Sequence, residues 1–345
     1  MINLPLLCVM GPTAAGKTAF AIELAESLGG ELISVDSALV YRGLAIGAAQ
    51  PDYPHHLIDI RDPSEPYSAA EFARDAAEAI ADIRARGRLP ILVGGTLLYF
   101  RALLQGFDAI PATRPEVRAD IEEEAARSGW PALHAKLAEV DPVLAARLHP
   151  NHSQRIGRGL EVWRMTGRPL SSWQEGNLSP AVDGEAIPLV IAPRSREELH
   201  GRIARRFDDM LSEGFLEEVE ALYRRGDLTP DLPAIRAVGY RQMWRYVAGE
   251  TNLETAREAG IAATRQLAKR QLTGLRRWPD ALWLLTGPDL QLSEVKTASE
   301  GRLLALARTI DTTLIKGEQV FSRPSHSFSR QIGEILRNLV ANGNN

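Results

Sequence analysis

The stretch Leu4-Pro-Leu-Leu-Cys-Val-Met-Gly-Pro-Thr-Ala-Ala-Gly-Lys-Thr-Ala-Phe20 decides the fold of this chain. An apolar run from Leu6 to Met10 breaks at Gly11, and Gly16-Lys17-Thr18 then opens a segment with helical spacing. Strand, glycine loop and helix form the context that the phosphate-binding pattern G-x-x-x-x-G-K-[ST] requires. A chance glycine turn is the alternative, and this context argues against it. We therefore predict a P-loop that follows the first strand of the sheet.

Such a loop binds phosphate through its backbone. Successive N–H groups and the positive end of the following helix form a cradle for a di- or triphosphate. Lys17 adds a cation at the terminal phosphate, and the Thr18 hydroxyl can hold a Mg²⁺ that bridges phosphate oxygens. Kinases, hydrolases and other transferases share this cradle, so the loop alone leaves the reaction open. The predicted diphosphate-binding residues are Gly11, Pro12, Thr13, Ala14, Ala15, Gly16, Lys17 and Thr18.

The composition is that of an ordinary globular protein. The chain has 345 residues, of which 24% are charged and 45% hydrophobic, and a formal net charge of −4. A negative balance argues against indiscriminate coating of nucleic acid, although local basic stripes remain possible. The single cysteine, Cys8, excludes a disulfide framework and is expected to be buried. Because neither a long apolar run nor a signal-peptide pattern is present, we expect a cytoplasmic protein without membrane contact. We also expect a monomer.

Strand and helix patterns alternate along much of the chain. Continuous apolar strands followed by helical periodicity indicate a parallel sheet covered by helices. We therefore predict an α/β fold with a P-loop NTPase-like parallel sheet. The predicted strands include residues 31–36, 54–59, 89–96, 187–192 and 281–285, and the predicted helices include 17–28, 64–86, 196–225 and 252–278.

Residues 115–166 show only helical periodicity, which predicts an all-helical insertion in the α/β core. The polar end of the chain predicts a poorly ordered tail. The predicted organisation is a first part of the core at 1–112, the helical insertion at 113–186, a second part of the core with basic helices at 187–290, and a weakly patterned, partly disordered tail at 291–345.

Two polar residues end predicted strands. Ligands of open α/β sheets lie beyond the carboxyl ends of the strands, so Asp36 should lie near the phosphate cradle. It could act as a general base, a magnesium ligand or a helix N-cap. Thr96 follows Gly94 and Gly95 and would point a hydroxyl into the same cleft, although these glycines could simply allow close packing. No Asp follows Ile91-Leu-Val93, where a nucleotide hydrolase would carry a second magnesium carboxylate, and this counts against an ordinary ATPase.

Several segments are locally basic. Arg202, Arg205 and Arg206 share one predicted helix, where they could face a leaving phosphate or form a solvated face paired with acidic neighbours. The solvated face is the better interpretation of Arg202 and Arg205. Three further segments could contact an RNA backbone or could be solvated helix faces, and their joint occurrence favours RNA. They span residues 154–158, 236–242 and 265–278.

Seven motifs in one order closely resemble those of the bacterial tRNA dimethylallyltransferases, also called tRNA isopentenyltransferases. The resemblance extends from about Leu4 to Leu285 and is highly specific because all seven motifs occur together. They are Gly11–Thr18, Val35–Leu39, His55–Asp59, Val93–Thr96, Gln154–Ile156, Arg236–Gln242 and Thr264–Arg270.

The resemblance implies transfer of a dimethylallyl group from dimethylallyl diphosphate to the N6 amine of the adenosine 3′ of the tRNA anticodon, with release of diphosphate. It implies that the P-loop holds a diphosphate and that Asp36 is the general base. Lys17, Thr18 and Arg206 would stabilise the leaving group together with Mg²⁺ bound through Thr18, and Thr96 would lie near the tRNA substrate. These five residues are the predicted catalytic set.

The resemblance also implies a set of RNA contacts, with the helical insertion gripping the anticodon stem-loop. Ala15 departs from the usual serine, Gly157 and Gly159 are expected to interrupt a helix, and Gly274 replaces a usual aromatic residue. The implied tRNA-binding residues are Asp36, Ser37, Ala38, Leu39, Thr96, Arg118, Gln154, Arg155, Ile156, Gly157, Arg158, Arg236, Ala237, Val238, Gly239, Tyr240 and Arg241.

Two other functions compete with this one. An ATP-dependent small-molecule kinase would use the same loop for ATP, and it predicts ATP binding and turnover. A non-catalytic RNA-binding protein with a relict P-loop predicts RNA binding without chemistry.

Overall fold

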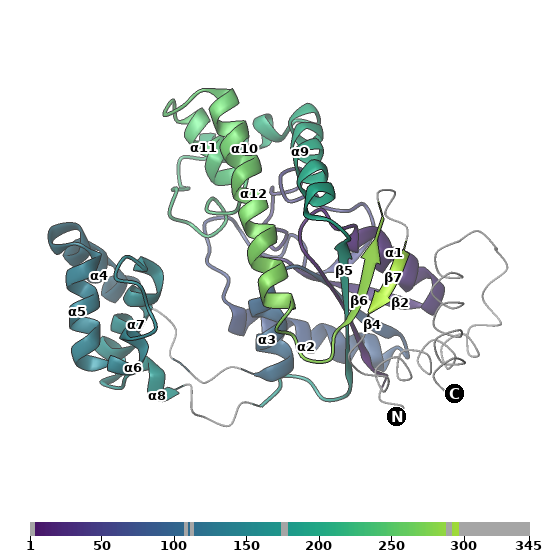
Figure 1. Cartoon of the computed structure of the whole chain (residues 1–345), viewed down its shortest axis with the longest axis horizontal. Coiled ribbons are helices and arrows are strands. Elements are labelled where there is room, and N and C mark those ends of the chain that lie inside the picture. The colour runs from purple at the N-terminus through teal and green to yellow at the C-terminus, as the bar shows by residue number, and fades with distance from the viewer. Residues whose placement is uncertain (1–3, 107–109, 111–113, 174–178, 288–291, 297–345) are drawn as a thin grey trace. The chain divides into compact units, whose positions relative to one another are not determined.

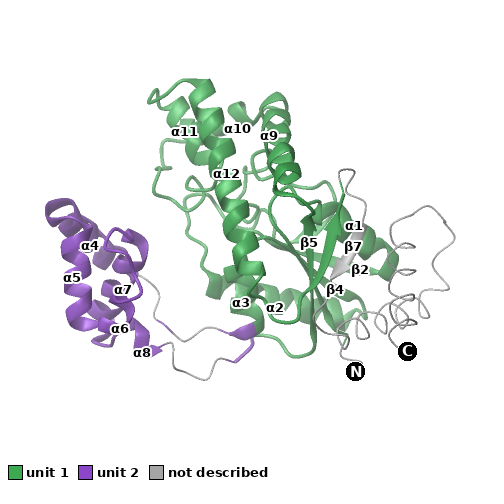
Figure 2. Cartoon of the chain, in the orientation of Figure 1, with its two compact units in different colours: residues 1–104, 181–345 green, residues 105–180 purple. Residues whose placement is uncertain are grey.

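A computed structural model describes residues 4–106, 110, 114–173, 179–287 and 292–296 (Figure 1). The chain divides into two compact units, which are described separately (Figure 2). Unit 1 comprises Met1–Leu104 and Ala181–Asn345, and unit 2 comprises Gln105–Pro180. Unit 2 overlaps most of the predicted insertion, 113–186. The predicted tail, 291–345, lies outside the described residues except for 292–296.

Unit 1 has the predicted α/β fold, in which helices cover a mostly parallel sheet. Its described strands form a seven-stranded sheet in the order β3-β2-β4-β1-β5-β6-β7. All neighbouring strands are parallel except β6 and β7. The strands are β1 (Leu6–Met10), β2 (Gly30–Val35), β3 (His55–His56), β4 (Leu89–Gly94), β5 (Ala186–Pro193), β6 (Leu282–Thr286) and β7 (Leu292–Lys296).

Side-chain alternation along β1 divides the core between the two faces of the sheet. Leu7 and Val9 pack with Phe20, Ala21 and Leu24 of helix α1 (Lys17–Leu28) on one face. Leu6, Cys8 and Met10 point to the other face and join a larger cluster. This alternation follows from the period of two in a strand. Cys8 is fully buried, as the sequence predicts.

The larger face is covered by helices from both parts of unit 1. The side chain of Ser68 accepts a hydrogen bond from the Glu71 N–H in a capping box, and this explains why the helix predicted from residue 64 begins at 69. The helices on this face are α2 (Ala69–Ala85), α3 (Leu97–Gln105), α9 (Arg196–Ser212), α10 (Phe215–Arg224), α11 (Tyr240–Val247) and α12 (Leu253–Leu275).

The structure of unit 1 differs from the sequence predictions or adds to them in three places. The helix predicted over 196–225 is two helices, because Gly214 adopts a left-handed φ of 103° and turns the chain between α9 and α10. The sequence reading also missed the short helices α3 and α11. Residues 292–296, assigned to a weakly patterned tail, pair with β6 as the antiparallel strand β7.

Unit 2 is all-helical, with its own apolar core. Ile121, Leu133, Leu137, Ile156 and Leu160 are at most 2% exposed. The expectation that glycines interrupt the helix after residue 153 was wrong, because α7 runs unbroken and a Cβ at Gly159 would lie only 2.8 Å from a Leu137 methyl. The helices are α4 (Pro115–Ser128), α5 (Trp130–Val140), α6 (Pro142–Ala145), α7 (Ser153–Thr166) and α8 (Leu170–Trp173).

In the described part of the chain, no helix combines the length and the apolar character needed to cross a membrane.

Candidate functional site

The P-loop connects β1 to α1 and carries backbone strain. Ala14 has a φ of 60° and Gly16 a φ of 88°, both in the left-handed region. That region is unfavourable for a residue with a Cβ, and such strain is concentrated at ligand sites. The loop conformation at Ala14 is therefore held by its surroundings, which is the behaviour of a preformed cradle.

Lys17 lies over this loop as the first residue of α1. Its Nζ donates a hydrogen bond of 2.8 Å to the Pro12 carbonyl oxygen, and its stem would contact a Cβ at Gly11. Burial lowers the pKa of Lys17 to about 8; repulsion by Arg206 adds to this effect and attraction by Asp36 opposes it. An anion that enters the loop would stabilise the charged form of this buried ammonium.

Asp36 and Arg206 complete a cluster of charges with Lys17. Arg206 comes from α9, and burial lowers its pKa, with Asp36 opposing that effect. Asp36 follows β2, and its Oδ1 accepts a hydrogen bond of 2.8 Å from the Ala38 N–H, which fixes the carboxylate in a turn. The fold thus brings α1, the end of β2 and α9 within electrostatic range of one another.

Thr96 joins the end of β4 to the end of β2. Its Oγ1 accepts a hydrogen bond of 3.2 Å from the Ser37 N–H, next to Asp36. The Thr96 N–H in turn donates to the Val35 carbonyl oxygen at 3.3 Å. Thr96 therefore lies beside Asp36 at the same edge of the sheet as the P-loop.

Gln271, on α12, is the residue of this site that the sequence reading missed. Its Oε1 accepts a hydrogen bond of 2.9 Å from the Thr13 N–H, and its Nε2 donates to the Gly95 carbonyl oxygen at 3.1 Å. The partners are 258 and 176 residues away in the chain, so no local sequence pattern predicts the contact. The Thr13 N–H, predicted as part of the cradle, is used by this side chain.

The donors near the loop suit a magnesium ion that shares phosphate oxygens and water. Among the described residues, no group of three or more His, Cys, Asp and Glu side chains could hold a metal. Mg²⁺ typically uses one or two protein oxygens plus substrate phosphates. The Thr18 hydroxyl, in the first turn of α1, matches that donor set.

The predicted RNA-contacting residues of unit 1 divide by exposure. Ser37 and Arg241 are exposed, and Ala38, Leu39, Arg236, Ala237 and Val238 are partly buried. Tyr240 is 1% exposed, and its hydroxyl donates a hydrogen bond of 2.6 Å to Glu218. The Tyr240 side chain and the buried Gly239 are therefore part of the core beneath the exposed residues.

Two of the predicted RNA-contacting residues of unit 2 pair with one buried carboxylate. Glu161 is 2% exposed and forms ion pairs with Arg118 at 3.3 Å and Arg158 at 3.4 Å. Gln154 and Arg155 are exposed, whereas Ile156 and Gly157 are buried. Glu161 thus orients two of the predicted RNA-binding arginines from inside the helical core.

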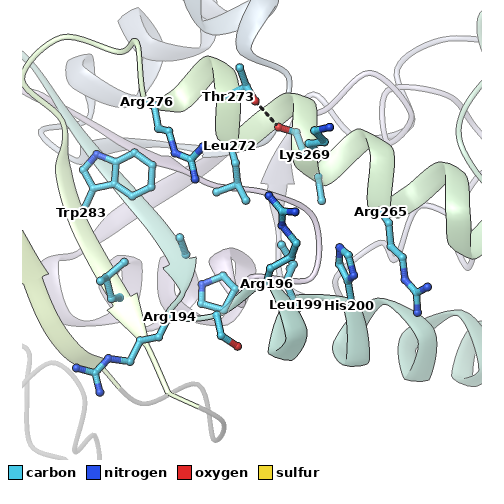
Figure 3. A pocket seen from close by; sticks show the side chains of 15 residues that line it. Arg194, Arg196, Leu199, His200, Arg265, Lys269, Leu272, Thr273, Arg276 and Trp283 are labelled. Carbon is cyan, nitrogen blue, oxygen red and sulfur yellow. Dashed lines mark hydrogen bonds between the residues drawn. The ribbon is translucent and has the colours of Figure 1, made fainter.

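A separate cavity of about 250 Å³ opens between α9, α12 and the ends of β5 and β6 (Figure 3). Its lining includes Arg196 and His200 from α9, Arg265 and Lys269 from α12, Arg194, and Arg276 just after α12, and it contains no acidic residue. Burial, followed by repulsion from Arg265 and Arg196, lowers the pKa of His200. The cavity lies outside the P-loop and is suited to an anion.

The chain matches the model of the IPP transferase family over residues 39–278 and that of the isopentenyl transferase family over residues 4–57. It is 56% identical to a tRNA dimethylallyltransferase of Methylococcus capsulatus, over 82% of this chain and 93% of that protein. It is 58% identical to a tRNA dimethylallyltransferase of Thioalkalivibrio sulfidiphilus, over 80% of this chain and 88% of that protein.

A solved relative shares the fold as well. The crystal structure of the tRNA isopentenylpyrophosphate transferase of Bacillus halodurans superposes with a TM-score of 0.60 at 35% identity, covering 92% of this chain and 99% of that chain. A family model matched over more than half of the chain and relatives above 50% identity over most of it lead to one conclusion: this chain is a member of the IPP transferase family.

Proposed function

We propose that this protein transfers a dimethylallyl group from dimethylallyl diphosphate to the N6 amine of the adenosine 3′ of the tRNA anticodon. The observation that carries the proposal is the cluster of Lys17, Asp36 and Arg206 at the mouth of the P-loop. Two cations and strained loop amides suit a diphosphate leaving group, and one carboxylate beside them suits a base. The names of the relatives support the same reaction.

The diphosphate half of the reaction uses preorganised charge. The adenine nitrogen forms a bond to the allylic carbon while the carbon–oxygen bond to diphosphate breaks, so negative charge grows on the leaving group. Lys17 and Arg206 are already partly desolvated, and their attraction for that growing charge is correspondingly strong. Loop N–H groups from Ala14 onward would donate to the same oxygens.

Attack by the adenine amine requires a proton acceptor and an adenine that is accessible to the active site. An adenine must leave its stack for its amine to reach a buried electrophile. Asp36 would hydrogen-bond the amine and take its proton as the new carbon–nitrogen bond forms. Its Oδ1 is engaged by the Ala38 N–H, and Oδ2 makes no part of that turn, so Oδ2 is the oxygen we assign to the amine.

Thr18 and the diphosphate oxygens would hold Mg²⁺. A bound magnesium ion supplies Lewis-acid neutralisation of phosphate charge.

The RNA would be gripped by basic residues of both units. Arg118 and Arg158 on the helical unit share the buried Glu161, which limits their rotamers and so lowers the entropy cost of binding phosphate. The cationic cavity beside α12 would be a second binding site for backbone phosphates. We expect this RNA binding to weaken steeply with salt.

The competing functions lack a specific observation of this kind. β4 is followed by Gly95 and Thr96, with no acidic residue at the position where an ATP-hydrolysing enzyme carries its second metal carboxylate. A relict P-loop would not need Lys17, Asp36 and Arg206 in electrostatic contact.

The decisive experiment mixes the purified protein with Mg²⁺, dimethylallyl diphosphate and an unmodified anticodon stem-loop that has adenosine 3′ of the anticodon. Mass spectrometry of the RNA should show a gain of one dimethylallyl group in place of hydrogen. A stem-loop with guanosine at that position is the matched control and should keep its mass. An unchanged adenosine stem-loop would exclude the proposed function, and ATP turnover in its place would favour the kinase.

The depressed pKa of Lys17 predicts a specific pH dependence for binding of dimethylallyl diphosphate. Below pH 8 Lys17 is already protonated, so its contribution to affinity should be constant. Above a pKa of about 8 the free protein loses this charge, while the bound anion raises the pKa and recovers the proton. Affinity should therefore fall by up to about tenfold per pH unit above pH 8.

Isothermal titration between pH 7 and pH 10 measures this effect. The Lys17→Met variant is the control, because it cannot titrate and should give a flatter profile. Equal slopes for the two proteins would show that another group is responsible.

A further inference from the structure

Gln271 links two loops that flank the predicted diphosphate site. The P-loop follows β1 and the Gly94-Gly95-Thr96 turn follows β4, and these strands are neighbours in the sheet. Both amide atoms of Gln271 are used, one on each loop, at 2.9 Å to the Thr13 N and 3.1 Å to the Gly95 O. A single side chain thus fixes the spacing between the two strand ends.

The surrounding backbone is built to admit this side chain. A Cβ at Gly95 would lie 2.3 Å from Nε2 of Gln271, a distance that real Cβ contacts do not reach. Any other residue at position 95 would therefore displace Gln271. The link continues from Gly95 to Thr96, which holds the Ser37 N–H next to Asp36. One set of contacts therefore runs from α12 through the Gly95-Thr96 turn to the turn that carries Asp36, and a second contact joins α12 to the P-loop.

We propose that Gln271 is a positioning residue for the transfer reaction, which holds the P-loop and the Thr96 turn at the spacing needed for diphosphate and acceptor amine together. This inference rests on the proposed function. Gln271 touches neither reactant. Because Gln271 occupies the Thr13 N–H, the first loop N–H that remains for a diphosphate is that of Ala14. Gln271 therefore also determines how deeply a diphosphate binds in the loop.

The test measures binding of inorganic diphosphate with Mg²⁺ by calorimetry, in the absence of RNA. Gln271→Met keeps the length of the side chain and removes both hydrogen bonds. It should weaken diphosphate binding by about tenfold or more, because the loop would no longer be held at the required spacing before diphosphate binds, with affinity for the anticodon stem-loop unchanged. Asn252→Ala is the control: it removes the N-cap of the same helix, where the Asn252 side chain accepts a bond from the Thr255 N–H, and should leave diphosphate affinity as it is.

Gln271→Glu tests the mechanism within one folded protein. An ionised carboxylate still accepts from the Thr13 N–H but repels the Gly95 carbonyl oxygen, whereas a protonated carboxyl group again offers one acceptor and one donor. The diphosphate affinity of this variant, divided by that of the wild type at the same pH, should recover as the pH falls from 8 to 5. The same ratio for Gln271→Met should stay low at every pH.

The outcomes separate this inference from the proposed function. If the wild type binds no diphosphate, the proposed function fails. If the wild type binds it and Gln271→Met binds it within about twofold, only the positioning role fails. A loss in Gln271→Glu without a loss in Gln271→Met would assign the effect to added negative charge and would also overturn the positioning role.

Discussion

Lys17→Ala is expected to lower kcat for dimethylallyl transfer by about 100- to 1,000-fold, the usual cost of losing one preorganised donor to a developing oxyanion. The reason is the desolvated position of the ammonium, which depresses its pKa to about 8 in the free protein. Such a cation interacts most favourably with the state that has most negative charge on the diphosphate. Single-turnover kinetics with a labelled anticodon stem-loop measure the loss.

A second substitution separates charge from packing. The stem of Lys17 packs beside Gly11, so Lys17→Met keeps that contact and removes only the ammonium. It should be as slow as Lys17→Ala. The affinity of both variants for the stem-loop alone should equal that of the wild type. A Lys17→Met enzyme with near wild-type kcat would contradict the role of this charge.

Asp36→Asn is expected to lower kcat by about 100- to 10,000-fold, the range attributed to one general base. Asparagine keeps an oxygen that can accept from the Ala38 N–H, so the turn after β2 should survive. It cannot take the amine proton at neutral pH. RNA affinity should change little, because asparagine keeps an oxygen that can accept a hydrogen bond from the adenine amine.

The control for this variant is Asp52→Asn, an exposed carboxylate of the same unit. It should retain full activity. An Asp36→Asn enzyme with full kcat would assign proton transfer to another group or to solvent.

Local sequence patterns were sufficient for the main elements of the fold. The apolar run before Gly11, the alternation of Leu7 and Val9 with Leu6 and Met10, and the helical spacing of 115–166 each depend on neighbours in the chain. Such patterns predict strands, faces and helices directly. They predict the boundaries of helices less well, because the helical period continues through Gly214. They also miss the short helix α11, which is anchored by the long-range Tyr240–Glu218 contact.

The sequence by itself determined the chemistry that each residue could perform: a phosphate loop with Lys17, a carboxylate at the end of a strand, and arginines on helices. Only the tertiary structure decided which of these residues meet. Arg206 reaches Lys17 and Asp36 because α9 packs on the sheet, and Gln271 reaches Thr13 and Gly95 across 258 and 176 residues of chain. Contacts of this kind depend on the packing of distant elements, and a local pattern contains no information about that packing.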